Sequence, residues 1–251
     1  MLSAESAAAD IAWAAKEMDT RMQPVAIVVP PNVVETGRVH AATATASGSL
    51  ADGPAAASVV PLVPTISRRA AITAARTPIR AEPIVHANGY ICRESFSVGD
   101  RPANFYMIGS MGLASAIGLG LALARPERAA VVFDGDGNLL MNFGILAMVG
   151  SAAPRRLVHV VFDNEVYGST GNQRSPSRGV RLDRVAAAAG YRSVAAVTTA
   201  DGVEQAMRAA VASDGPHFVL VKTTAAEADV PRIPHTPAAI RDRFRASLET
   251  A

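Results

Sequence analysis

The chain has 251 residues, of which 49% are hydrophobic and 18% charged, and its formal net charge is only +2. Its arginines are scattered rather than clustered with aromatic residues, so we expect no nucleic-acid partner. The longest apolar stretch, Ile108 to Ala124, is too short and too rich in glycine for a membrane span. Residues 1–15 lack a basic start and a long apolar stretch, so we expect no signal peptide. The single cysteine, Cys92, fits a reducing cytoplasm.

The first part of the chain is predicted to be a helix followed by a strand. Ser3 to Met18 carries alanine, isoleucine and tryptophan at helical spacing, and Val25 to Val29 is a β-branched run that stops at two prolines. Alanine, serine, threonine, glycine and proline then dominate, which is the composition of a linker, although Arg68 to Arg76 has a helical pattern. The predicted parts are therefore 1–34, a helix-strand unit; 35–80, a linker; and 81–251, the main domain.

The main domain alternates strands with helices. Strands are expected at Ile84–His86, Phe105–Met107, Ala129–Phe133, Leu157–Phe162, Arg192–Val197 and Phe218–Val221. Helices are expected at Leu113–Ala124, Leu139–Gly150, Leu182–Ala189, Gly202–Ala212 and Thr236–Leu248. This order predicts an α/β fold with a doubly wound parallel sheet.

Polar residues follow two of these strands. Gly135-Asp136-Gly137 ends one, and Asp163-Asn164 ends the next. Parallel strands present their carboxyl ends at one edge of a sheet, so Asp136 and Asn164 are expected to converge there. Carboxylate and amide oxygens suit Mg²⁺, the glycines admit a ligand close to the backbone, and a helix starting near Asn138 would direct N–H groups at an anion. The sequence therefore predicts a site for a divalent cation and a diphosphate; the alternative is two ordinary strand-end turns.

The two segments resemble the thiamine diphosphate motif, in which GDG is followed by a segment ending in Asn-Asn or Asp-Asn. Over Ile84 to Phe244, the runs NFYMIGSMGLASAIGLGLALARPERAAVVFDGDG and DNEVYGSTGNQ resemble sulfopyruvate and phosphonopyruvate decarboxylases. Those enzymes remove CO₂ from a 2-keto acid with a sulfonate or phosphonate on C3. The resemblance implies thiamine diphosphate and Mg²⁺ as cofactors, with the metal held by the Asp136 carboxylate, the Asn164 side chain and the Val166 carbonyl.

The same resemblance implies roles for the Gly109-Ser110-Met111-Gly112 segment. In the family, the residue at Gly109 accepts a hydrogen bond from the 4′-amino group of the cofactor, and the bulky residue at Met111 forces the cofactor into a V shape. A methionine that fills a gap in the core is the alternative for Met111. The cofactor-binding residues that we expect are Asn88, Gly89, Gly109, Ser110, Met111, Gly135, Asp136, Gly137, Asn138, Asn164, Gly168 and Ser169.

One part of the family pattern is missing. The run PVAIVVPP resembles the end of a pyrimidine-binding domain, which normally supplies a glutamate to N1′ of the cofactor. Neither Glu5 nor Glu17 matches the position of that glutamate. We therefore expect either a partner chain that carries the pyrimidine-binding domain or a gene that is a fragment.

Substrate residues are predicted from the loop after the metal-binding strand. Thr170 occupies the place of a glutamate found in simple pyruvate decarboxylases, and Gln173 offers a neutral amide, so both join Gly109 and Met111 as candidate catalytic residues. Arg93 and Arg174, with Arg178, could bind a second anionic group, or could be ordinary surface residues. Two further functions stay open: another thiamine diphosphate-dependent lyase or synthase, and a non-catalytic subunit. Sulfonate and phosphonate substrates are not distinguished.

Overall fold

The computed structural model describes residues 6–21, 62–226 and 229–249. The chain divides into two compact units, Met1–Val59 and Val60–Ala251. The first unit contributes helix α1 (Ala7–Arg21), which matches the predicted helix, whereas the predicted strand at Val25 to Val29 lies outside the described residues. No helix in the described part of the chain is both long and apolar enough to cross a membrane.

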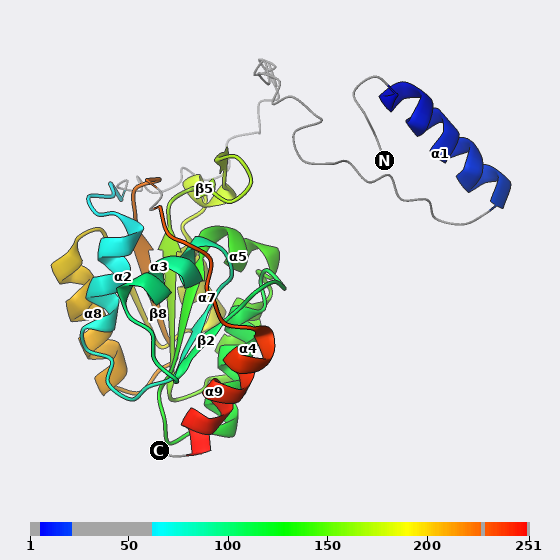
Figure 1. Ribbon diagram of the computed structural model, residues 1–251. Helices are drawn as coiled ribbons and strands as arrows, with labels where there is room; N and C mark the ends of the chain where they lie inside the picture. Colours follow the sequence, from blue (N-terminus) through cyan, green and yellow to red (C-terminus); the bar gives the residue numbers. More distant parts are fainter. Residues whose placement is uncertain (1–5, 22–61, 227–228, 250–251) are drawn as a thin grey trace. The chain divides into compact units, whose positions relative to one another are not determined.

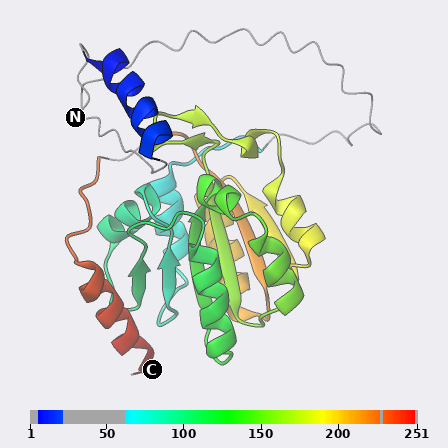
Figure 2. The same ribbon diagram turned by 90° about the vertical axis from the view of Figure 1, so that its right-hand side faces the viewer.

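The second unit is built on one parallel sheet of six strands in the order β2-β1-β3-β4-β8-β7 (Figures 1 and 2). The strands are β1 (Ile84–His86), β2 (Asn104–Tyr106), β3 (Ala130–Gly135), β4 (Leu157–Asp163), β7 (Ser193–Val197) and β8 (His217–Lys222). The central strands β3, β4 and β8 are buried along their whole length, which explains their continuous β-branched and aromatic runs. The predicted doubly wound parallel sheet is confirmed.

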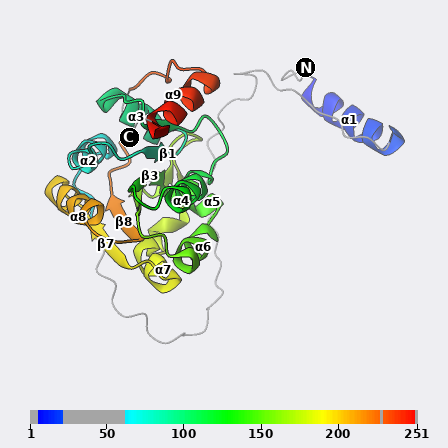
Figure 3. The same cartoon turned by 90° about the horizontal axis from the view of Figure 1, so that it is seen from below.

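Helices cover both faces of the sheet (Figure 3). One face carries α2 (Arg68–Arg76), α3 (Tyr90–Val98) and α8 (Ala200–Ala212); the other carries α4 (Ala114–Ala124), α6 (Ile145–Ala152) and α7 (Leu182–Ala189). Side chains alternate between the two cores along β3, so that Val131 and Phe133 pack on the first face and Val132 packs on the second. Helix α9 (Pro237–Glu249) packs beside β2, with the rings of Phe105 and Phe244 5.3 Å apart.

Three features differ from the sequence-based expectations. The single helix expected over Leu139–Gly150 is two helices, α5 (Asp136–Met141) and α6, because Asn142 leaves the helical conformation at φ −139° and donates its amide to the Gly112 carbonyl at 3.1 Å. Helix α3 was not predicted. The compact unit also begins upstream of residue 81, because α2 packs on α3 and α8 with Ile72 fully buried.

A small hairpin and one short helix complete the unit. Strands β5 (Val166–Tyr167) and β6 (Gln173–Arg174) pair antiparallel, and η1 (Pro176–Arg178) is a 3₁₀ turn. Both follow β4, so they lie at the carboxyl edge of the sheet. This edge is where the sequence placed its polar residues.

Candidate cofactor site

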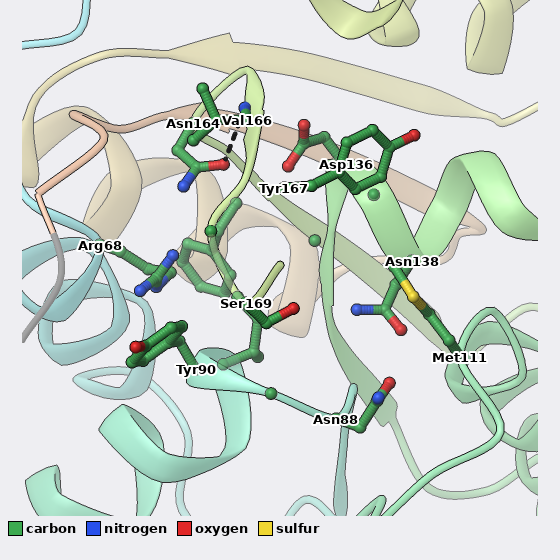
Figure 4. Close-up of a pocket in the computed structure, with 16 residues that line it drawn as sticks. Arg68, Asn88, Tyr90, Met111, Asp136, Asn138, Asn164, Val166, Tyr167 and Ser169 are labelled. Carbon is green, nitrogen blue, oxygen red and sulfur yellow. Dashed lines mark hydrogen bonds between the residues drawn. The ribbon is translucent and has the colours of Figure 1, made fainter. Parts of the chain in front are cut away.

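A pocket opens at the carboxyl ends of β1, β3 and β4 (Figure 4). Strands β1 and β3 are neighbours, but the connection after β1 runs over the α3 face and the connection after β3 runs over the α6 face. Such a reversal is where open α/β sheets bind ligands. The described lining residues are Arg68, Asn88, Gly89, Tyr90, Ile91, Met111, Gly135, Asp136, Gly137, Asn138, Phe162, Asn164, Val166, Tyr167, Gly168 and Ser169.

Three oxygen-bearing groups converge in this pocket. One terminal atom of the Asn164 amide lies 2.9 Å from the Val166 carbonyl oxygen and 3.3 Å from Asp136 Oδ1. A nitrogen in that position would donate to both neighbours, whereas an oxygen there leaves three acceptors facing one another. With the oxygen in place, the Val166 N–H donates to it at 3.3 Å (Figure 4).

Facing oxygens repel one another unless a cation lies between them. Carboxylate, amide and carbonyl oxygens are the ligand types that Mg²⁺ takes from proteins. Within the described residues, no group of three or more His, Cys, Asp and Glu side chains is arranged to hold a metal. The donor set of Asp136, Asn164 and Val166 therefore fits a hard divalent cation.

A buried polar network fixes the Asp136 carboxylate. The Ser177 hydroxyl lies 3.2 Å from Asp136 Oδ2 and 2.7 Å from Asp163 Oδ1, and Lys222 Nζ donates to Asp163 Oδ2 at 2.8 Å and to Glu165 Oε1 at 2.5 Å. A hydroxyl carries one proton, so it can donate to only one of the two carboxylates at a time. Burial, together with the negative charge of Asp163, raises the pKa of Asp136 to about 6. A metal cation would remove this penalty.

The glycine at 137 is required by a close contact. A Cβ there would lie 2.8 Å from the ring of Tyr167 and 3.3 Å from the Met111 Cε atom, so any other residue would displace the Tyr167 ring. At Gly135 an added Cβ would meet only ordinary contacts of 3.7 Å or more. Space therefore explains the second glycine of the GDG motif but not the first.

The turn that carries Met111 is attached to α5. The Gly112 N–H donates to Asn138 Oδ1 at 3.3 Å, which leaves the NH₂ group of Asn138 to face the pocket. Met111 is 36% exposed and reaches the pocket wall, so it is not a fully buried core methionine. Gly109 and Ser110 instead line a neighbouring apolar hollow with Ile108 and other residues.

The predicted substrate residues lie outside this pocket wall. Thr170 and Gln173 are exposed and hydrogen-bond each other at 2.8 Å across the β5–β6 hairpin. Arg174 and Arg178 are exposed, and the Arg93 guanidinium stacks over the Tyr90 ring, 5.4 Å from its centroid. The structure therefore brings most of the expected cofactor residues together but not the expected substrate arginines.

Two histidines and the cysteine are structural. His86 is fully buried beneath the site and hydrogen-bonds the Ser95 hydroxyl at 2.7 Å; burial lowers its pKa to about 3, so it is neutral. His159 is equally buried between Asp134 and Tyr191. Cys92 lies in the first turn of α3, where burial raises the pKa of its thiol to about 11. A thiol of that kind is unreactive at neutral pH.

Sequence reasoning missed several residues of the site. Arg68 and Tyr90 line the pocket, and Ser177 and Lys222 support Asp136 through contacts with Asp163, whose pairing role was not predicted. Lys222 carried a usable signal, since it directly follows a predicted strand and is one of only two lysines in the chain. Arg68 carried no such signal, because it begins a short helical pattern inside the region 35–80 that was predicted to be a linker.

The sequence matches the family described as thiamine pyrophosphate enzyme, C-terminal TPP binding domain, over residues 94–221, just over half of the chain. The chain therefore belongs to this family. Thiamine pyrophosphate, in the name of the family, is another name for thiamine diphosphate. The match includes the GDG turn, the Asp163-Asn164 pair and the connecting strands.

Among similar proteins, a phosphonopyruvate decarboxylase of Streptomyces viridochromogenes is 46% identical over 172 residues, which cover 68% of this chain and 43% of the relative. A sulfopyruvate decarboxylase subunit beta of Methanococcus maripaludis is 38% identical over 168 residues, which cover 67% of this chain and 90% of the relative. The chain thus spans less than half of the first relative and nearly all of the second.

Solved structures share the fold. The benzoylformate decarboxylase from Polynucleobacter necessarius superposes with a TM-score of 0.57 at 21% identity, over 68% of this chain and 34% of that one. A thiamine diphosphate-dependent 4-hydroxybenzoylformate decarboxylase from Rhodococcus jostii RHA1 gives the same TM-score at 18% identity, over 68% and 35%. At these identities the likeness concerns the fold alone.

Proposed function

We propose that this chain is the cofactor-binding subunit of a thiamine diphosphate-dependent 2-keto acid decarboxylase that acts on sulfopyruvate or phosphonopyruvate and releases CO₂ and an aldehyde. The observation that carries the proposal is the convergence of Asp136, Asn164 and Val166 at the strand ends, next to a pocket walled by Gly137, Asn138 and the 168–169 backbone. The names of the two relatives, a phosphonopyruvate decarboxylase and a sulfopyruvate decarboxylase subunit, support the proposed substrate class.

In this proposal each residue has a binding or orienting role. Asp136, Asn164 and the Val166 carbonyl hold Mg²⁺, and the metal ties the diphosphate to the edge of the sheet. Asn138 and Asn88 supply amide groups to the pocket; Asn88 Oδ1 is buried without a hydrogen-bond partner among the described residues, as expected for a group that meets a ligand. Met111 lies where it can support the organic part of the cofactor.

The bound cofactor supplies the electron sink that accepts the electrons of the breaking carbon–carbon bond. Its activation requires a proton relay at the aminopyrimidine ring. Within the described residues, the pocket wall contains no glutamate. We therefore propose that a partner chain with a pyrimidine-binding domain supplies it, so that the active enzyme is a hetero-oligomer.

The test is a reconstitution assay. The purified chain is assayed for CO₂ release from sulfopyruvate, phosphonopyruvate and pyruvate, with thiamine diphosphate and Mg²⁺, alone and with a candidate pyrimidine-binding subunit. We expect no turnover by the chain alone and turnover of at least one anionic substrate by the mixture. Full turnover by the chain alone would contradict the need for a partner. Turnover of pyruvate equal to that of the two anionic substrates would contradict the substrate assignment but would still agree with a thiamine diphosphate-dependent decarboxylase.

A further inference from the structure

Arg68 is the one cationic side chain among the described residues that line the pocket. It begins α2, whose start is fixed by the Ser67 hydroxyl accepting from the Ala70 N–H at 3.2 Å. Its side chain is only 6% exposed, so the guanidinium has been taken out of bulk water. Burying a cation is costly unless it has a partner or a ligand.

The buried partner of Arg68 is Glu94, and the pairing leaves donors unused. Nε and Nη2 of Arg68 both donate to the same oxygen, Glu94 Oε1, at 3.2 and 2.6 Å. Nη1 makes no hydrogen bond within the described part of the chain, and the Tyr90 ring lies 5.2 Å from the guanidinium carbon. Glu94 does not line the pocket, so the side of the pair that faces it is the cation.

The charges of the residues that line the pocket indicate which ligand Arg68 would bind. The other charged lining residue in the described part is Asp136, which is negative when it holds a metal. A divalent cation at Asp136 offsets only part of the charge of a diphosphate, which carries several negative charges at neutral pH. The planar fork of a guanidinium matches the oxygens of a phosphate group.

The position of Arg68 in the pocket indicates which end of the cofactor it would contact. In Figure 4, Arg68 and Tyr90 lie on the side of the pocket opposite Met111 and Asn138, with the metal-binding residues at a third side. Met111 marks the end where the organic rings of the cofactor are proposed to lie. The diphosphate therefore extends toward Arg68.

We propose that Arg68 binds the terminal phosphate of the diphosphate held in this pocket, and that Glu94 positions the guanidinium for it. The inference rests on the proposed cofactor site and adds a residue from the segment that the sequence marks as a linker. A contact between Arg68 and the terminal phosphate would make the pocket bind a diphosphate more tightly than a monophosphate.

Calorimetry on the full chain with Mg²⁺ tests the proposal, with thiamine diphosphate, thiamine monophosphate and inorganic pyrophosphate as probes. Arg68→Met should weaken thiamine diphosphate and pyrophosphate binding about ten- to hundredfold, as for the loss of one charge-assisted contact. Thiamine monophosphate, which lacks the terminal phosphate, should bind within about threefold of the wild type. Arg69→Met is the matched control, because Arg69 is the next residue of α2, is exposed and carries the same charge.

A double variant separates binding from folding. Arg68→Met leaves Glu94 buried without its partner, whereas Arg68→Met/Glu94→Met removes both charges and keeps the volume. The double variant should show the same selective loss for the two diphosphate ligands. For the positioning role, Glu94→Gln, which keeps an acceptor oxygen, should retain the preference for the diphosphate, and Glu94→Met should reduce it.

Two results would overturn the inference while leaving the proposed function intact. One is wild-type affinity for thiamine diphosphate in both Arg68 variants. The other is an equal loss of affinity for the diphosphate and monophosphate forms, which would give Arg68 a structural role. Failure of the wild-type chain to bind either thiamine diphosphate or pyrophosphate with Mg²⁺ would overturn the cofactor site and this inference together. Arg68-dependent binding without decarboxylation by the assembled enzyme would contradict only the proposed reaction.

Discussion

The Asp136–Asn164 end of the pocket and the hairpin loop at 168–173 lie at the same edge of the sheet, yet they differ in how they are held. Asp136 and Asn164 are buried and belong to a network that runs through Ser177 and Asp163 to Lys222. The loop is exposed beyond Gly168 and bonds mainly to itself, for example from the Asn172 N–H to the Tyr167 carbonyl at 3.1 Å. The Asp136–Asn164 end is held by buried contacts within this chain, whereas the hairpin loop is exposed on one side.

This difference is what the proposed sharing of the active site between two chains would produce. A metal site must hold several ligands at set distances, which requires buried and mutually bonded side chains. A substrate pocket also needs walls that exclude water. The described residues include the buried, mutually bonded side chains that a metal site requires. They supply only part of the walls of a substrate pocket. The four predictions below test the contrast.

The largest effect is expected at the metal. Asp136→Ala removes the charged ligand, so Mg²⁺-dependent binding of thiamine diphosphate should fall by more than about a hundredfold, since a lost charged contact in a buried site exceeds ~3 kcal/mol. Calorimetry with and without Mg²⁺ measures this change. Asp201→Ala, at an exposed position in α8, is the control. Unchanged affinity in the Asp136 variant would remove the metal assignment.

The supporting network should matter for stability. Lys222→Met leaves Asp163 and Glu165 without their shared cation, and breaking a buried ion pair from one side costs about 3 kcal/mol or more. Urea unfolding of the apo chain checks this value. Lys16→Met changes the other lysine of the chain, which is exposed on α1, and should leave stability unchanged. A loss below about 1 kcal/mol in the Lys222 variant would show that the network is not a stabilising unit.

The third prediction concerns pH. The pKa of Asp136 is raised from 3.8 to about 6, so the folded state binds this proton more tightly than the unfolded state. Its contribution to stability is therefore full below about pH 4 and is lost as the pH rises through about 6. Without metal, the chain should lose roughly 1–1.5 kcal/mol from this group between pH 5 and 7.5, because about half of the total loss of ~3 kcal/mol already occurs below pH 5.

Added Mg²⁺ should restore that loss, so the rise in melting temperature on adding Mg²⁺ should be larger at pH 7.5 than at pH 5. Asp136→Asn removes the titrating group and serves as the control. It should melt higher than the wild-type apo chain at pH 7.5 and respond little to Mg²⁺. An equal Mg²⁺ effect at both pH values in the wild type would contradict the coupling.

The smallest effect is expected in the loop. Gln173→Ala removes two hydrogen bonds with Thr170, but both side chains are exposed, so stability should change by less than about 0.5 kcal/mol. Thiamine diphosphate affinity should stay within about threefold of the wild type. A loss of stability above about 1 kcal/mol would mean that the loop is as firmly held as the metal end.

The sheet and the convergence of Asp136 with Asn164 were predictable because local sequence determines them. Buried parallel strands require runs such as Val131 to Phe133, and polar residues directly after such runs can lie only at the carboxyl edge. The break between α5 and α6 was not predictable from the apolar spacing. It depends on the bond from Asn142 to Gly112, thirty positions earlier in the chain.

By itself, the sequence determined the parallel sheet, its polar edge and the family motif, since strand periodicity and strand ends are local properties. Only the tertiary structure decided which distant charges meet there. Lys222 reaches Asp163 across the β4–β8 pair, and Arg68 reaches the pocket because α2 packs beside α3. Such contacts depend on how helices and strands pack, and packing joins residues whose separation along the chain carries no periodic signal.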